Sequence, residues 1–463
     1  MLRRLRHPLT AVALTVLLTL PWVFTWATHG GHVSPGETLP AGTTVVVAGL
    51  AVLGASFLLA WGAETAEKDV PRAFAIAVLA VLAVAPEYAV DALYAWQAGA
   101  FEGTARGTEA ANLAVANMTG ANRILIGIGW SAIALFTVFR AKTSHDPAVK
   151  FRDGFLRDAV ELDRDIATEI AFLLAATAFA FFVPFSMATL DNGGPAGGIG
   201  LVDTAVLVGL YLLYISIIIR GDVEEHEGQV GVPAYLQSFS KGPRIASVIL
   251  LFAYSGTMIF IAVEPFAHGL EILGEQAGVP PFFMIQWIAP LASESPELIV
   301  VAYLVNKARS TAGFNALISS KLNQWTLLIG TLAVVYSIAA GHLGALPFDQ
   351  KQVAEIWITA AQSLFALAIL SNFEISMREA ISLLVLFVSQ VVIEFVLIQT
   401  LPEARAEALS IDVLYAYTVV YLVLGLWLFY RRRDDLRRLF SRTATTAQDA
   451  IRSSQPQAER ADD

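Results

Sequence analysis

The residues best placed to do chemistry are carboxylates that stand beside prolines inside long apolar runs. Glu294 and Glu297 are one helical turn apart with Pro296 between them, and Glu87 follows Pro86 in an earlier run. A carboxylate buried in lipid is costly and rare, so an acid inside a membrane span is a candidate functional residue. Such an acid can bind a cation or a proton.

The two acid-proline motifs belong to a longer internal repeat. Downstream of them, one constant offset relates Thr119, Asn122 and Gly129 to Ser320, Asn323 and Gly330. Acids beside prolines in corresponding places of two halves are typical of transporters built from repeats.

The composition excludes several classes of protein. The chain of 463 residues is 56% hydrophobic and 15% charged, which is too apolar for a soluble protein and fits one with many membrane spans. It has no cysteine, so disulfides, thiolate metal sites and cysteine catalysis are excluded. No HExxH motif, P-loop or nucleophile-base pair is present. We therefore expect no enzyme, no bound cofactor and no nucleic-acid partner.

About 12 apolar runs are long enough to cross a bilayer as helices. Helices are expected because an α-helix pairs its own backbone N–H and C=O groups, for which lipid offers no partner. The runs lie at approximately 8–28, 41–62, 72–97, 109–139, 165–186, 200–220, 244–266, 281–305, 312–340, 353–371, 376–400 and 411–430. The first could be a cleaved signal peptide, but its length and the lack of a clean cleavage site favour a retained span.

Positive charge supports this count of spans. With the N-terminus inside, one side receives nearly all the basic residues, including the loop 140–164 and the tail from Arg431 to Arg442. The opposite side receives only Arg106, Lys351 and Arg405. This asymmetry predicts an integral protein of the cell membrane with both termini in the cytoplasm.

The domain organisation follows from the two copies. The run that carries Glu87 enters from the cytoplasmic side and the run that carries Glu297 from the other, so the repeats are inverted. The predicted segments are an extra span and loop (1–40), a first half (41–220, repeat about 72–139), a cytoplasmic linker (221–243), a second half (244–400, repeat about 281–340), an extra span (401–440) and a disordered tail (441–463). The fold class is all-α.

These motifs resemble the calcium/cation antiporter superfamily, which includes the sodium/calcium and calcium/proton exchangers. Its two inverted repeats each carry a G-T-S-x-P-E motif followed by G-N-x-x-G-S-N. Here the corresponding segments are Ala85-Pro86-Glu87 with Ala116–Asn122, and Ser293–Glu297 with Ser319–Asn323. The resemblance implies a ten-helix core and a divalent-ion site between the two Pro-Glu glutamates.

The candidate ligands come partly from the resemblance and partly from helix geometry. The resemblance implies Glu87 and Glu297 as the flanking acids, with further oxygens from Thr119, Asn122, Ser320 and Asn323. Asp91 shares a helix face with Glu87, and Glu294 shares one with Glu297, because residues three or four apart are neighbours. Carboxylates, hydroxyls, amide oxygens and carbonyls freed near a proline are the ligands that Ca²⁺ prefers.

Two basic residues depart from the family pattern. Arg123 falls where exchangers carry a sodium-binding residue, and Lys321 falls near such a position. As built-in cations they argue against an ordinary set of sodium sites. With four ionised acids and these two bases, the net charge of minus two would match one divalent ion.

The sequence thus predicts a secondary antiporter that moves Ca²⁺ in exchange for Na⁺ or H⁺ by alternating access, with cations and the lipid bilayer as its partners. One alternative is a monovalent cation/proton exchanger on the same fold. Another is a non-transporting scaffold or sensor, in which Glu87 and Glu297 form buried salt bridges with Arg123 and Lys321.

Overall fold

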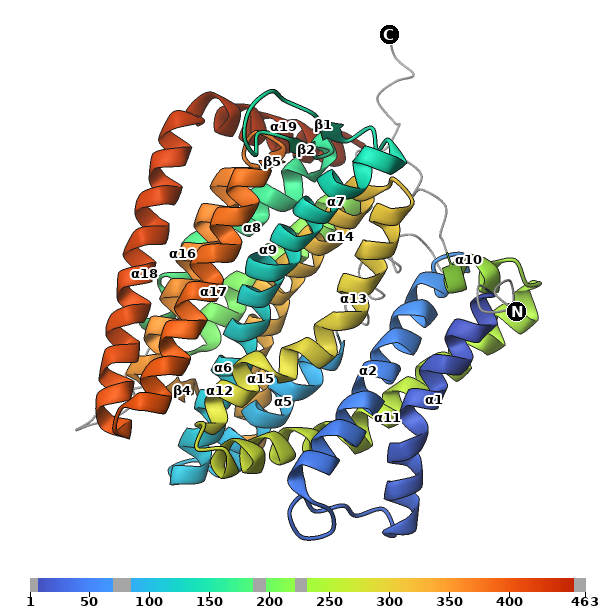
Figure 1. The fold of residues 1–463 in the computed structure, drawn as a ribbon, viewed down its shortest axis with the longest axis vertical. Coiled ribbons are helices and arrows are strands. Elements are labelled where there is room, and N and C mark those ends of the chain that lie inside the picture. Colours follow the sequence, from blue (N-terminus) through green and yellow to red (C-terminus); the bar gives the residue numbers. More distant parts are fainter. Residues whose placement is uncertain (1–6, 70–84, 186–196, 221–230, 454–463) are drawn as a thin grey trace, which may run out of the picture.

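The computed structural model describes residues 7–69, 85–185, 197–220 and 231–453. The start of the predicted span 72–97, part of the predicted linker (221–230) and the end of the tail lie outside the described residues. The remainder is a bundle of long helices (Figure 1). The predicted helical membrane fold is confirmed.

Helices of the first half precede the linker, and one additional helix comes before them. They are α1 (Pro8–Thr28), α2 (Ala41–Ala66), α5 (Ala85–Ala100), α6 (Ala105–Ile124), the π-helix η2 (Leu125–Trp130), α7 (Ser131–Ser144), α8 (Ala167–Ala180) and α9 (Leu201–Arg220).

Helices of the second half repeat this order after the short α10 (Gly231–Gln237). They are α11 (Lys241–Gln276), α12 (Pro281–Trp287), α13 (Ala289–Asn306), α14 (Ser310–Asn323), the π-helix η5 (Gln324–Leu328), α15 (Ile329–Ala340), α16 (Gln350–Leu370) and α17 (Met377–Thr400). Two more helices follow, α18 (Glu403–Arg431) and α19 (Arg433–Ser453).

The number of spans differs from the predicted twelve. In the described part of the chain, ten helices are long and apolar enough to cross a membrane, and the pair Pro281–Ser295 and Glu297–Asn306, bent by 49°, would make eleven. Helix α5 contains only the second part of the predicted run 72–97. The count of twelve is therefore not confirmed.

Local sequence signals explain where several helices begin. Thr104 caps α6 by accepting a hydrogen bond from the backbone N–H of Gly107 at 3.1 Å. Asp349 caps α16 in the same way through Gln352 N–H at 2.9 Å. Ser376 and Glu379 form a capping box at the start of α17. Such caps satisfy backbone donors that the helix itself leaves unpaired.

Short strands join loops of the two halves at each end of the bundle, a feature that the sequence did not predict. At the first end, β1 (Val149–Lys150), β2 (Ala159–Glu161) and β5 (Glu374–Ser376) form an antiparallel sheet in the order β1-β2-β5. At the other end, β3 (Gly197–Ile199) pairs antiparallel with β4 (Leu346–Phe348). Each sheet links a loop of one repeat to a loop of the other.

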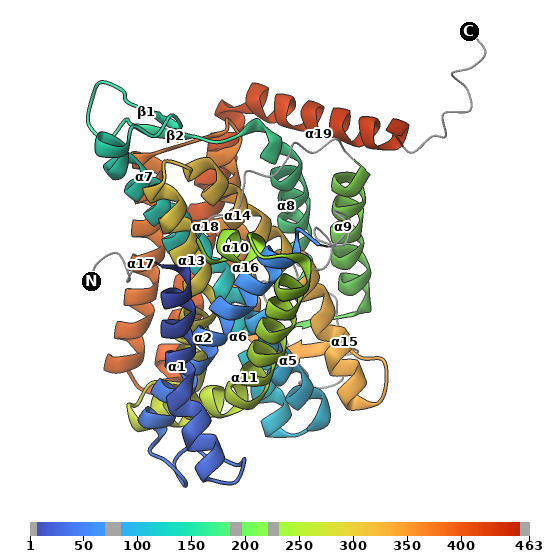
Figure 2. The same ribbon diagram turned by 90° about the vertical axis from the view of Figure 1, so that its right-hand side faces the viewer.

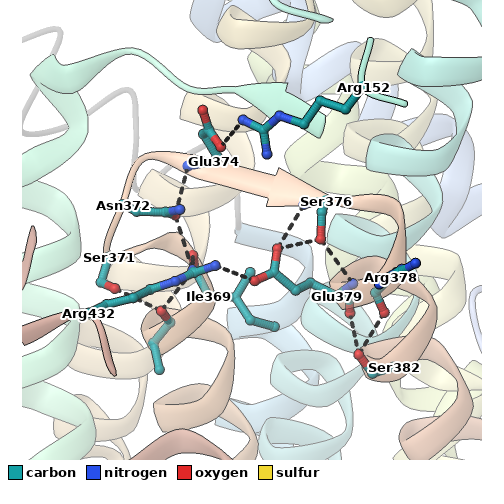
Figure 3. A network of polar contacts seen from close by, with 11 residues as sticks. Arg152, Ile369, Ser371, Asn372, Glu374, Ser376, Arg378, Glu379, Ser382 and Arg432 are labelled. Atoms are coloured by element: carbon teal, nitrogen blue, oxygen red, sulfur yellow. Dashed lines mark hydrogen bonds and ion pairs between the residues drawn. The ribbon is translucent and has the colours of Figure 1, made fainter. Parts of the chain in front are cut away.

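We call the end with residues 145–164, 371–378 and α19 the basic end, and the end with residues 101–104 and 341–349 the opposite end. At the basic end, Arg432 at the close of α18 donates to the Glu379 carboxylate at 2.5 Å and to Asn372 Oδ1 at 3.1 Å (Figure 3). Arg152 pairs with Glu374 at 2.7 Å in the same view. These contacts fix the α16–α17 loop against α18 and the sheet.

The two repeats run in opposite directions. Helix α5 ends at the opposite end, where Glu102 in the following loop contacts His342 at 2.7 Å. Helix α13 ends at the basic end, where Asp146 accepts a hydrogen bond from the N–H of Ser310 at 3.4 Å. The predicted inversion is therefore confirmed.

Helices α1, α2 and α11 form a group beside the larger bundle (Figure 1). At Gly54 of α2, an added Cβ would lie 2.9 Å from the carbonyl oxygen of Thr15, so α1 and α2 approach closely. Asp69, just after α2, binds the Arg244 guanidinium of α11 through two contacts of 2.5 Å. This ion pair ties the ends of α2 and α11 together.

The C-terminal segment corrects a prediction. Residues 441–463 were expected to be disordered, but α19 continues as a helix to Ser453. It lies across the basic end, beside α8 and α9 (Figure 2). Its amphipathic pattern explains this: Leu439 and Ala450 are buried, and the Thr443 hydroxyl donates to the carbonyl of Ala167 at 3.1 Å.

Candidate functional site

Three glutamates from the two repeats come together inside the bundle. Helix α5 carries Glu87, which is 3% exposed, and α13 carries Glu294, which is 1% exposed, and Glu297, which is half-buried. Glu294 interacts electrostatically with both of the others, and Glu297 interacts with Glu87. The structure therefore brings the two Pro-Glu motifs near one another, close to the bend of the chain just before Glu297.

Two glutamates of this cluster accept hydrogen bonds from neutral donors. Ser320 Oγ donates to Glu297 Oε2 at 2.9 Å, and Gln324 Nε2 donates to Glu294 Oε1 at 2.5 Å. Ser293 lies close enough to Glu87 to interact with it electrostatically, and its hydroxyl donates to the carbonyl of Pro290 at 3.3 Å. Within the described ranges, none of the three glutamates forms a salt bridge. A cluster of acids oriented by neutral groups keeps its capacity to bind a cation.

Asp91 lies one turn beyond Glu87 on α5 and is 1% exposed. Its Oδ1 accepts a hydrogen bond from Asn117 Nδ2 at 2.8 Å, and it interacts electrostatically with Glu87. Asn117 was not among the predicted site residues. Its signal in the sequence was an amide in the same apolar run as Thr119 and Asn122.

The predicted neutral ligands have different partners. Ser320 contacts a carboxylate directly, as described above. The hydroxyl of Thr119 donates to the carbonyl of Val115 in its own helix at 2.8 Å. The side-chain oxygen of Asn122 accepts from Lys321 Nζ at 2.6 Å, and that of Asn323 accepts from the Tyr88 hydroxyl at 3.1 Å. Thr119, Asn122 and Asn323 thus bind other groups of the protein in this conformation.

Arg123 lies outside the cluster, which corrects the expectation that it acts there as a built-in cation. Its Nη1 pairs with Glu355 Oε2 of α16 at 2.5 Å, and its Nη2 donates to Gln390 of α17. The guanidinium also lies 5.0 Å from the centre of the Trp287 ring. Lys321 bonds to Asn122 instead of a carboxylate. The alternative of buried salt bridges from Glu87 and Glu297 to these bases is therefore wrong.

The two helices that carry the polar residues change geometry at matching places. Helix α6 ends at Ile124 and continues as the π-helix η2, and α14 ends at Asn323 and continues as η5. Short π-helical segments inside α-helices are frequent at functional sites. One begins three residues after Asn122 and the other directly after Asn323, so both repeats carry a π-helix close to the motif asparagine.

Comparison with known proteins identifies the family. The family model described as "Sodium/calcium exchanger protein" matches residues 40–220 and 247–396. The crystal structure of the H⁺/Ca²⁺ exchanger CAX is 42% identical, with a TM-score of 0.80, over 95% of this chain and 98% of that one.

The chain belongs to the sodium/calcium exchanger protein family.

Other comparisons agree with this assignment at the level of the fold. The structure of the Ca²⁺/H⁺ antiporter YfkE is 15% identical with a TM-score of 0.56, and the match covers 83% of this chain and 98% of that one. Comparison with curated protein sequences gave no match. Helices α1, α18 and α19 lie outside the residues that the family model matches.

A polar cavity lies on the side of the cluster toward the opposite end. It has a volume of about 420 Å³ and lies between α5, α6 and α11. Three acids line it, Glu109, Glu264 and Glu271, and the Tyr94 hydroxyl donates to Glu271 at 2.7 Å. Tyr94 follows Asp91 by one helical turn, so this acidic cavity adjoins the buried acids of the exchanger.

The cluster does not form a closed metal cage by itself. Among the described residues, no three histidine, aspartate or glutamate side chains are placed to hold a metal ion together. Ca²⁺ takes six to eight oxygens and accepts hydroxyl, amide and carbonyl oxygens beside carboxylates. Ser320 and Gln324 are neutral groups that contact the acids directly.

Proposed function

We propose that this chain is a secondary antiporter that exchanges Ca²⁺ for H⁺. The observation that carries the proposal is the convergence of Glu87 from one inverted repeat with Glu294 and Glu297 from the other. Two oppositely directed helices thereby present acids to one buried point, which is where an ion must sit for alternating access. The likeness to the H⁺/Ca²⁺ exchanger CAX supports Ca²⁺ as cargo and H⁺ as counter-ion.

The chemistry of the cluster fits both ions. Glu87 and Glu297, with Ser320 and Ser293, supply hard oxygen ligands of the kind that Ca²⁺ requires. A carboxylate oxygen that binds Ca²⁺ cannot also carry a proton. The same acids can therefore release Ca²⁺ on one side when they take up protons and release the protons on the other side when they take up Ca²⁺.

Alternating access requires one group of helices to move against another. Helices α1, α2 and α11 form such a group, and α11 also lines the polar cavity. The sheets β1-β2-β5 and β3-β4 tie the larger bundle together across the repeats. We propose that the cluster is exposed alternately to the two ends as the α1-α2-α11 group shifts against the larger bundle.

The test is Ca²⁺ uptake into proteoliposomes driven by a pH gradient. The variants Glu87→Gln and Glu297→Gln keep size and hydrogen bonding but lose the charge, so each should abolish uptake. Glu169→Gln is the matched control, because Glu169 is a carboxylate outside the cluster that accepts a hydrogen bond from Tyr214 at 3.1 Å. Uptake that persists in both cluster variants, or that ignores the pH gradient, would contradict the proposal.

We further propose that the basic end faces the cytoplasm of the cell membrane, since basic loops remain on that side. The chain has no cysteine, so an introduced cysteine is a unique label. Leu343 at the opposite end is 79% exposed, and Gln448 on α19 is exposed. In intact cells, a membrane-impermeant maleimide should react with Leu343→Cys and not with Gln448→Cys. The reverse labelling would invert the orientation.

A further inference from the structure

Lys321 is a buried base whose ammonium group bonds to an asparagine of the other repeat. Its side chain is fully buried in α14, and no acid of the described residues lies within salt-bridge distance of its ammonium group. Instead Nζ donates to Asn122 Oδ1 at 2.6 Å and to the Asn122 backbone oxygen at 3.3 Å. It also lies 4.4 Å from the centre of the Trp325 ring. The ammonium group is thus held by two oxygens and an aromatic face.

This environment is what a bound monovalent cation would need. The two oxygens come from Asn122 of the first repeat, whereas Lys321 belongs to the second, so the contact crosses the interface between the repeats. The matching asparagine, Asn323, receives the neutral hydroxyl of Tyr88 at its side-chain oxygen. Among the described residues the two positions therefore differ: an ammonium group donates to Asn122, and a neutral hydroxyl donates to Asn323.

The charge of Lys321 acts on the acid cluster. Lys321 and Glu294 interact electrostatically, and Glu294 interacts with Glu87 and Glu297 in turn. When these three glutamates are ionised and Lys321 carries its proton, their net charge is minus two, which one divalent cation neutralises. Without the ammonium group the net charge would be minus three, and a divalent ion would need a monovalent companion. An uncompensated charge in this buried place is expensive.

We propose that Lys321 is a tethered monovalent cation that occupies a second cation position beside the divalent site. It sets the charge of the cluster to match one divalent ion and makes transport independent of Na⁺. This inference rests on the proposed exchange of Ca²⁺. Lys321 determines ion selectivity because its ammonium group binds the two oxygens of Asn122 that a mobile cation would otherwise bind.

The experiment measures Ca²⁺ uptake into proteoliposomes with Na⁺ or choline as the monovalent cation, at a clamped membrane potential. Wild-type uptake should be the same in both. In Lys321→Ser, which leaves space and a hydroxyl oxygen, uptake in choline should fall about tenfold or more and Na⁺ should restore it, because a buried charge has lost its partner. Lys321→Arg keeps the charge, and whatever uptake it retains should not depend on Na⁺.

A charge-balanced variant separates this role from a purely structural one. Lys321→Met with Glu294→Gln removes one charge of each sign, so the remaining uptake should again be independent of Na⁺. This variant also provides the test if Lys321→Ser does not fold, because dependence of its uptake on Na⁺ would contradict the proposal.

The other outcomes are equally distinct. A folded Lys321→Ser protein that transports in choline as wild type does would overturn the tethered cation and leave Ca²⁺/H⁺ exchange intact. Wild-type uptake driven by a Na⁺ gradient would overturn it as well. Absence of Ca²⁺ uptake by the wild type would overturn the proposed exchange itself, and the tethered cation with it.

Discussion

Gly120 provides a test of the site geometry that alters no ligand. It lies on α6 between Thr119 and Asn122, at the closest approach of α6 to α12. A Cβ at this position would lie 1.8 Å from the carbonyl oxygen of Gln286 and 2.7 Å from its carbonyl carbon. Both obstacles are backbone atoms, so a rotamer change cannot relieve the clash.

The size of the required displacement follows from these distances. Ordinary van der Waals contact begins at 3.4 Å, so α6 and α12 must separate by about 1.6 Å to accommodate Gly120→Ala. Helix α12 leads directly into α13 with Glu294 and Glu297. A functional site tolerates misplacement of about 0.5 Å, and Ca²⁺–oxygen distances span only about 2.3–2.6 Å. We therefore expect Gly120→Ala to lose most Ca²⁺ uptake and about 1–3 kcal/mol of stability.

The matched control is Gly256→Ala on α11, where an added Cβ meets nothing within 4 Å. Alanine favours a helix over glycine by about 0.5–1 kcal/mol, so this variant should be slightly more stable and fully active. Uptake in proteoliposomes and the thermal unfolding midpoint in detergent measure both effects. Gly120→Ala with wild-type uptake and stability would refute the close approach of α6 and α12.

Three further predictions concern charges away from the cluster. Arg123→Met leaves Glu355 buried without its partner and should cost about 3–5 kcal/mol of stability. The double variant Arg123→Met with Glu355→Met should cost much less. Equal losses of stability for the two variants in unfolding experiments would contradict a buried ion pair. Arg432→Met removes the contacts to Glu379 and to the α16–α17 loop, so it should cost about 1.5–3 kcal/mol of stability and lower the thermal unfolding midpoint. An unchanged midpoint would show that the loop does not depend on Arg432. At the opposite end, hydrogen bonds from Tyr336 and from His342 lower the pKa of Glu102 below its ordinary 4.5, and the hydrogen bond to Glu102 raises the pKa of His342 above its ordinary 6.5. The stabilisation from this pair is therefore complete between pH 4.5 and 6.5. It falls in acid as Glu102 is protonated, and it falls in base as His342 loses its proton. The difference in unfolding midpoint between wild type and His342→Ala should follow this profile, and a difference that does not vary with pH would contradict it.

Much of the fold could be predicted from the sequence because it depends on local composition. Apolar runs of about 20 residues predict membrane helices regardless of their neighbours. The repeated Pro-Glu motifs placed Glu87 and Glu297 at equivalent positions, and an odd number of spans between them implied opposite directions. The family resemblance rested on the same motifs and is confirmed by the match over residues 40–220 and 247–396.

Other features depend on contacts between distant segments. The strands β2 and β5 are too short to show a pattern of their own and are defined by their pairing across the two halves of the chain. Helix α19 has a mostly polar sequence that is typical of a tail, yet its few apolar residues, such as Leu439, find a surface on the bundle. Neither contact can be inferred from a window of neighbouring residues.

The sequence by itself determined which residues could bind a cation: acids beside prolines in two inverted repeats. The tertiary structure alone decided which base faces which group. Asn122 and Arg123 are adjacent, but successive residues of an α-helix point about 100° apart. Asn122 therefore meets Lys321 of α14, while Arg123 turns to Glu355 of α16, which is 232 residues away in the chain. The rotation of each helix about its axis is set by packing against its neighbours, and it left the three glutamates without a salt bridge to any residue that the structure describes.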